Sequence, residues 1–352
     1  MKFLDPPQLP TIDVSVLPSG KAGRIGFDST SGYIYYDNGT SWIELGLTSQ
    51  LNQLQVEINN IDPPGIGVFG GGYNGAALST TTIYSYSTNS STTGGNLGYL
   101  TDDLVAAGNS TSGVFGGGVN NSGTILSTTS VYSYNNNSVS VGGNLSSVTY
   151  QPSVAGNSTL GVFSIGNNGS TTVSGTSVYT YSSNTAAAGG NLTYAVYSGT
   201  AVGNSTVGVF GSGYDGTTSV SATSVYTYSS NSAIVGGNLN YEASSITAAG
   251  NATIGVFGNG FSNTSVLLST TSVYTYSSNT AVAGGNLSYG MYGALAISNS
   301  AVAVFAGGNN GTNYLSTSTI YTYSTNTTIL GGNLNYVVAY MGAAGPTPGV
   351  NC

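Results

Sequence analysis

Hydrophobic and aromatic residues recur in short runs from residue 66 to residue 345, separated by Gly, Asn, Ser and Thr. One kind of run, such as Gly67–Gly72, is apolar and ends in glycines; another, such as Ser272–Tyr276, alternates polar residues with Val and Tyr. Alternation with a period of two is typical of β-strands, and this region has no helical periodicity. We therefore expect an all-β domain over residues 65–352.

The runs belong to a repeat. A Gly-Val-Phe sequence or its equivalent opens six units, at Gly67, Gly113, Gly161, Gly208, Gly255 and Ala303, in steps of 46, 48, 47, 47 and 48 residues. Each unit continues with a variable polar loop, a Tyr-containing strand, a Gly-Gly-Asn-Leu sequence and a run of small residues. Four short β-segments in each unit of this length predict the four-stranded blades of a six-bladed β-propeller.

The two ends of the repeat region predict a closed ring. The first unit lacks the small-residue run that precedes every other Gly-Val-Phe, and the chain supplies one more copy of it at Val338–Gly345. A C-terminal strand that completes the first blade leaves no open edge, whereas an open solenoid needs polar caps at its ends. We expect the C-terminal strand to close the propeller.

The units resemble kelch repeats in a few residues. In the second unit, Phe115-Gly116-Gly117 ends an apolar strand, and Val131-Tyr132-Ser133-Tyr134 follows after a polar loop. The resemblance covers residues 66–345 and implies a β-propeller that commonly has a binding role. A fold alone specifies no ligand.

Two segments precede the repeats. Three short β-runs between residues 20 and 46 predict a small β-module, which we assign to residues 1–46. Residues 47–64 carry the only helical signal, with Ser49 as N-cap and Pro63-Pro64 as the stop. Apolar residues at heptad spacing predict an oligomerising coiled coil, most simply a trimer, and the alternative is a short helix packed on its own β-module. The expected interface residues are Leu47, Leu51, Leu54, Ile58 and Ile61.

The N-terminal pattern is similar to a module of bacteriophage fibres and other virion proteins. The similarity rests on Leu17–Gly20, Gly26–Asp28, Gly32–Asp37 and Ser41-Trp42. It implies a virion appendage, either a tail fibre tip or a capsid fibre, made in the host cytoplasm. The module would bind other virion proteins and the propeller a host surface glycan or protein. The alternatives are a structural or decorating virion protein without a receptor, and a cell-surface carbohydrate-binding adhesin.

Composition excludes several kinds of chemistry. The chain has 3 Lys and Arg residues in 352, no His, and a single Cys at position 352. Its cations are Lys2, Lys21 and Arg24, so the expected propeller has no side chain that could neutralise a phosphate, and we expect no nucleic acid partner. Without His, a Cys/His metal site cannot form, and we expect no metal, no cofactor and no membrane insertion.

The propeller's carboxylates are too few and too scattered to predict an enzyme. Glycoside hydrolysis needs two carboxyl groups across one bond, but Asp102 and Asp103 are neighbours, which point to opposite faces of a strand. We expect a solvated strand end there, with a weak Ca²⁺ contact as the alternative. Asp215 and Glu242 lie in different elements of neighbouring units, so their pairing stays open. We expect no catalytic residue.

Tyrosines form six pairs at positions i and i+2, from Tyr84 and Tyr86 in the first unit to Tyr321 and Tyr323 in the last. Such residues share one face of a strand, and both faces of a propeller blade are covered by neighbouring blades. We expect the pairs to form the core between blades rather than a sugar-stacking surface.

The loop after each glycine-ended strand varies while its surroundings repeat, and all six loops should emerge on one rim. Exposed aromatic rings beside amides and carboxylates suit the apolar faces and hydroxyls of sugars. Unconstrained variation is the alternative interpretation. The candidate ligand-binding residues are Tyr73, Asn74, Asn120, Asn168, Tyr214, Asp215, Phe261 and Asn310.

Overall fold

The structure of the protein is a computed structural model that consists of two compact units, Met1–Asp62 and Pro63–Cys352. It describes residues 65–345 of the second unit without a gap. In the first unit it describes residues 11–12, 25–28, 30–31, 33–37 and 40–47.

The first unit contains one four-stranded sheet in the order β1-β2-β3-β4. Strands β2 to β4 are antiparallel neighbours, and β1 pairs in parallel with β2. Leu47 is the last residue of β4 and pairs with Tyr33, so its assignment to the start of a helix was wrong. The rest of the expected helix, with Leu51, Leu54, Ile58 and Ile61, lies outside the described residues. The strands are β1 (Thr11–Ile12), β2 (Ile25–Asp28), β3 (Tyr33–Asp37) and β4 (Trp42–Leu47).

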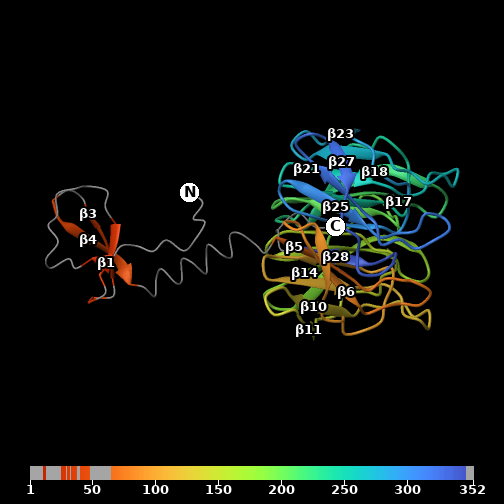
Figure 1. Ribbon diagram of the computed structural model, residues 1–352. Helices are drawn as coiled ribbons and strands as arrows, with labels where there is room; N and C mark the ends of the chain where they lie inside the picture. The colour runs from red at the N-terminus through yellow and green to blue at the C-terminus, as the bar shows by residue number, and fades with distance from the viewer. Residues whose placement is uncertain are drawn as a thin grey trace. The chain divides into compact units, whose positions relative to one another are not determined.

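The second unit is a six-bladed β-propeller (Figure 1), which confirms the fold expected from the repeats. Each blade is a four-stranded antiparallel sheet, and the part of the chain from 65 to 345 contains no helix. The first three blades are β28 (Gly342–Ala344), β5 (Ile66–Gly70), β6 (Thr81–Ser85) and β7 (Ser90–Thr93); β8 (Val105–Gly108), β9 (Ser112–Gly116), β10 (Thr129–Ser133) and β11 (Ser138–Val141); and β12 (Val154–Gly156), β13 (Leu160–Asn167), β14 (Thr172–Thr180) and β15 (Thr185–Ala188).

The remaining three blades repeat this order. They are β16 (Thr200–Gly203), β17 (Val207–Tyr214), β18 (Ser219–Thr227) and β19 (Ser232–Val235); β20 (Thr247–Gly250), β21 (Ile254–Gly258), β22 (Thr271–Thr275) and β23 (Thr280–Ala283); and β24 (Leu295–Ser298), β25 (Val302–Ala306), β26 (Ser318–Thr322) and β27 (Thr327–Leu330).

The first strand of each blade lies against the first strands of both neighbouring blades, so that β8, β12, β16, β20, β24 and β28 form a ring around the axis. Five of the six are buried along their full length, and β24 is buried except at its first residue, Leu295. They consist mainly of Ala, Gly, Val and Thr because neighbouring blades approach closely there. A Cβ on Gly113, at the start of the next strand, would lie 2.7 Å from the Ala344 Cβ.

The chain closes the ring with its last described strand. β28 pairs antiparallel with β5, in the register Gly342 with Gly70 and Ala344 with Val68, and the two lie side by side in Figure 1. The first blade is therefore completed by a segment that is separated from it by all the other blades. The closure expected from the additional small-residue run is confirmed.

A second set of contacts joins the blades farther from the axis. The second glycine of each Gly-Gly-Asn-Leu sequence donates its N–H to an Asn side chain of the next blade, as Gly95 does to Asn137 Oδ1 at 2.9 Å. The same Asn oxygen accepts the hydroxyl of a buried Tyr, here Tyr132. We call this arrangement the inter-blade contact. Its six glycine–asparagine pairs are Gly95–Asn137, Gly143–Asn184, Gly190–Asn231, Gly237–Asn279, Gly285–Asn326 and Gly332–Asn89.

The tyrosine pairs belong to this core, as expected. The first Tyr of every pair is at most 1% exposed. The Leu of each Gly-Gly-Asn-Leu sequence is also buried, and each lies in a hydrophobic cluster with Phe and Tyr side chains. The repeated residues of the sequence therefore hold one blade on the next.

Candidate functional site

One face of the propeller is built by two kinds of segment. The loop that follows the second strand of each blade lies beside the segment that leads into the first strand of the same blade, as Tyr214 pairs with Tyr197. The turn between strand and loop is a glycine with positive φ in all six blades, for example Gly213 at 112°. A Cβ there would lie 2.8 Å from the Tyr197 carbonyl oxygen, which excludes other residues. We call this the pocket face.

Six equivalent residues surround the propeller axis on the pocket face. Each has a positive φ, although five of them are not glycine. Backbone hydrogen bonds link them: Asp103 N donates to Tyr340 O at 3.0 Å, and Tyr340 N to Gly293 O at 2.7 Å. Such φ values are costly for residues other than glycine, and the five hydrogen bonds that join successive axial residues from Gln151 round to Asp103 hold them in place. The six axial residues are Asp103, Gln151, Ser198, Ser245, Gly293 and Tyr340.

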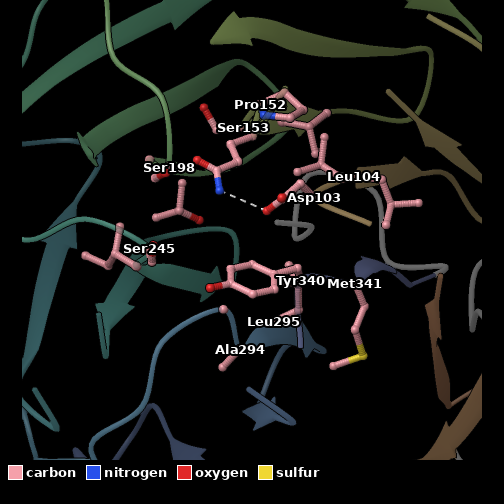
Figure 2. Close-up of a pocket in the computed structure, with 17 residues that line it drawn as sticks. Asp103, Leu104, Pro152, Ser153, Ser198, Ser245, Ala294, Leu295, Tyr340 and Met341 are labelled. Carbon is pink, nitrogen blue, oxygen red and sulfur yellow. Dashed lines mark hydrogen bonds between the residues drawn. The ribbon is translucent and has the colours of Figure 1, made fainter. Parts of the chain in front are cut away.

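The six axial residues form the mouth of a pocket with a cavity volume of about 60 Å³. In Figure 2 the side chains of Asp103, Ser198, Ser245 and Tyr340 lie around the opening, with the Tyr340 ring extending into it. Below the mouth the walls are apolar and come mainly from the residues just before the first strands. These wall residues include Leu104, Pro152, Ile246, Ala294, Leu295 and Met341. The site therefore combines a polar rim with a small apolar interior, and we call it the axial pocket.

A chain of side-chain hydrogen bonds runs along part of the mouth. Ser198 Oγ donates to Gln151 Oε1, and Gln151 Nε2 donates to Asp103 Oδ1 at 3.0 Å, the bond drawn in Figure 2. The chain fixes the orientation of the Gln151 amide and directs one of its N–H groups at the carboxylate. The polar rim is therefore ordered before any ligand arrives.

The structure corrects the expectation of a solvated strand end at Asp102 and Asp103. Both precede β8 at the pocket face, and Asp103 lines the pocket. Burial raises the pKa of Asp103 from 3.8 to about 7, opposed by hydrogen bonds from Gln151 and Tyr150 and assisted by the neighbouring Asp102. Burial also raises the pKa of Asp102, to about 6, and its Oδ1 is buried without a hydrogen-bond partner.

Aromatic side chains continue outward from the axial pocket. The Tyr340 ring lies 6.0 Å from the Tyr292 ring, and Tyr292 stacks on Phe261 with ring centroids 4.3 Å apart. Tyr73 of the first blade packs edge-on against Tyr314 of the last at 5.8 Å, and Tyr214 packs edge-on against Tyr197 within the blade that contains β17 at 5.6 Å. We call these seven residues the aromatic surface.

The candidate loop residues divide into two groups. The three aromatic candidates, Tyr73, Tyr214 and Phe261, are half-buried and belong to the aromatic surface. Four of the polar candidates shape their own loops, because their Oδ1 atoms accept backbone N–H groups two to four residues ahead. These four are Asn120, Asn168, Asp215 and Asn310, and Asn74 is exposed.

The remaining carboxylates do not form a pair. Asp215 accepts the backbone N–H groups of Thr217 and Thr218, and these bonds lower its pKa. Glu242 accepts the side-chain amide of Asn263 at 2.8 Å. Among the described residues, no group of three or more His, Cys, Asp or Glu side chains is arranged to hold a metal ion.

Sequence reasoning missed most of the axial pocket, including Gln151, Ser198, Tyr340 and the aromatic partner Tyr292. One signal could have found it: five of the six axial residues lie ten residues before the start of a Gly-Val-Phe or its equivalent. Alignment of the units on that offset would have placed five residues of different chemistry at one structural position. Tyr340 takes the sixth position through ring closure.

No protein-family model matches the chain, and a search of curated proteins finds no significant similarity. Within the described part of the chain, no helix is both long and apolar enough to cross a membrane.

Proposed function

We propose that this protein is a non-enzymatic bacteriophage appendage, a tail fibre tip or a capsid fibre, whose propeller binds a glycan on the host surface. The observation that carries the proposal is the aromatic surface around the axial pocket, where rings from several blades meet polar groups on one face. Aromatic rings beside fixed hydrogen-bonding groups suit the apolar faces and hydroxyls of sugars.

The order of the parts supports the appendage role. Residues 1–46 resemble a virion fibre module and would attach the protein to other virion proteins, while residues 47–64 would join the copies, most simply as a trimer. The kelch-like repeats then form the distal domain. The protein would be made in the host cytoplasm and act on the exterior of the virion.

The number and placement of charged residues favour binding of an uncharged or cationic surface ligand over nucleic acid recognition or glycoside hydrolysis. The chain from Ile25 onward has no Lys, Arg or His, and its propeller carboxylates are neighbours or bind separate partners. We infer that the protein works by contact and needs no cofactor or metal.

Binding of the fluorescently labelled full chain to candidate host cells tests this function. A variant with Tyr73, Tyr214 and Phe261 replaced by Ala should lose most of its saturable binding. A matched control replaces three exposed apolar residues of the outer strands, Val141, Ile234 and Val282, by Ala and should bind normally.

Two outcomes would redirect the proposal. No binding to any cell, including the host of the phage that encodes the protein, would favour a structural or decorating virion protein. Failure to co-purify with phage particles, together with retained cell binding, would favour an adhesin.

A further inference from the structure

The axial pocket has a size and composition that restrict its ligand. A cavity volume of about 60 Å³ admits a terminal group of a few atoms but not a sugar ring. Its rim supplies a carboxylate, an amide, two hydroxyls and a phenol, and its walls are apolar. A small polar group on a short apolar stem would fit this space, with the rest of the ligand outside.

Charge on the pocket face favours a cation. Asp103 lines the pocket and Asp102 is its neighbour in the chain, while the other two propeller carboxylates lie outside the pocket lining, in the loop after β17 and before β20. No cationic side chain occurs from Ile25 onward. An anionic ligand would therefore enter a field of its own sign, whereas a cationic ligand would find its counter-ions in place.

The Asp103 carboxylate can accept further hydrogen bonds, because each of its oxygens has two lone pairs. Its Oδ1 accepts from Gln151, and the neighbouring Asp102, which does not line the pocket, adds a second negative charge beside it. Carboxylates held away from water without a cation are unfavourable when ionised. A primary ammonium group has three N–H donors and one positive charge, so it would give Asp103 both a hydrogen-bond donor and a counter-ion.

The aromatic side chains around the mouth suit both the cation and its carrier. The Tyr340 ring lies over Gly293, where a Cβ would be 2.8 Å from Tyr340 Cε1, so the glycine makes room for the ring. Ring faces attract cations, and the rings of Tyr292 and Phe261 continue outward from Tyr340.

We propose that the axial pocket binds a primary ammonium group carried on an uncharged sugar. Asp103 would be the counter-ion, and the aromatic surface would be the platform for the sugar ring. This inference rests on the proposed receptor-binding function and specifies the receptor as an amino-bearing glycan. It moves the centre of recognition from the loop tips to the propeller axis.

Isothermal titration calorimetry on the full chain at pH 8 tests the inference with 6-amino-6-deoxy-D-glucose, and with D-glucose as the matched uncharged sugar. We expect saturable binding of the amino sugar and at least tenfold weaker binding of glucose. Asp103→Asn should weaken amino sugar binding at least tenfold. Glu242→Gln removes an exposed carboxylate of the same face, keeps an acceptor for Asn263, and should leave binding unchanged.

Tyr340→Gly tests the ring without disturbing the backbone, because Gly293 has the equivalent position and a similar positive φ, 62° against 56° for Tyr340. It should weaken binding at least fivefold while the far-ultraviolet circular dichroism spectrum is retained. Butylamine, which has a primary ammonium group but no sugar ring, tests whether the sugar contributes to binding. It should bind more weakly than the amino sugar.

Each contrary result has a distinct meaning. Absence of binding by both amines overturns the ammonium site, and if the labelled protein still binds host cells, the receptor function stands with another ligand. Equal binding of butylamine and the amino sugar overturns the sugar platform. An equal loss in Glu242→Gln and Asp103→Asn overturns the assignment to the axial pocket.

Discussion

The inter-blade contacts and the axial pocket occupy equivalent places in all six blades, yet their sequences differ in opposite ways. At the inter-blade contact, the same Gly, Asn, Leu and Tyr recur in every blade. Around the axis, the six equivalent positions hold Asp, Gln, Ser, Ser, Gly and Tyr. Repetition is required where each blade must fit the next, and it is absent where six blades together form a single asymmetric pocket.

Removal of the closing strand β28 should have the largest effect, because it disrupts both the contacts between blades and the axial pocket. Deletion of residues 337–352 removes β28 and Tyr340, and leaves β5 with one unpaired edge. We expect loss of cooperative thermal unfolding and aggregation, measured by circular dichroism and light scattering. A deletion that begins after Gly345 keeps β28 and should unfold normally. A soluble, cooperatively folded 1–336 fragment would refute the role of closure.

A methyl group at the inter-blade contact should have the next largest effect. In Gly95→Ala, the new Cβ would lie 2.5 Å from the Asn137 carbonyl oxygen, a backbone atom that cannot move without shifting the next blade. We expect a loss of about 3 kcal/mol in the free energy of unfolding, measured by urea denaturation.

Gly98→Ala is the matched control three residues farther along the same segment. Its Cβ would approach only Ser130 Oγ, at 3.4 Å, and the other units have Ser, Thr or Asn at this position. We expect a change below about 0.5 kcal/mol. Similar losses in the two variants would show that the repeated glycine is not constrained by the next blade.

The smallest predicted effect concerns the axial pocket and pH. Because the folded protein raises the pKa of Asp103 to about 7 and of Asp102 to about 6, it binds protons more tightly than the unfolded chain does. The contribution of these two carboxyl groups to the free energy of unfolding should therefore be greatest below about pH 4. It should fall as the pH rises through 7. We expect a difference of about 1 to 2 kcal/mol between pH 5 and pH 8, measured by denaturation, which is less than half of what the two raised pKa values would give for carboxyl groups fully removed from water, because both residues are only half-buried.

Few titratable groups face Asp103, so the origin of the pH dependence can be tested with one substitution. They are Asp102, Tyr150 and Tyr340, and both tyrosines remain neutral across this range because burial raises their pKa further. Asp103→Asn should reduce the pH dependence and stabilise the protein at pH 8. An unchanged pH profile in that variant would place the cause elsewhere.

The sequence predicted the parts of the fold that repeat. The spacing of Gly-Val-Phe, the tyrosine pairs and the additional strand at Val338–Gly345 led to six blades, their core and their closure. Leu47 was misassigned because its spacing to Leu51 suits a helix, whereas pairing with Tyr33 extends β4 to include it.

The axial pocket was harder to predict because no local pattern marks it. Its residues are about one repeat apart and differ in chemistry, and only ring closure brings Tyr340 beside Asp103. The prediction of the polar loop residues rests on residue type alone. Four of them proved to form turns, since an Asn or Asp oxygen that accepts its own backbone N–H groups is used within the loop.

The closing strand also determines the order in which the blades are completed during biosynthesis. β5 leaves the ribosome before the other strands of the propeller, and β28 is translated after all of them, so the first blade is completed only after the other five blades have been translated. The same late segment carries Tyr340 into the pocket. A ribosome that stalls before this segment would release a chain with neither a closed ring nor a complete binding site, and an unfinished copy could not compete with finished ones for the ligand.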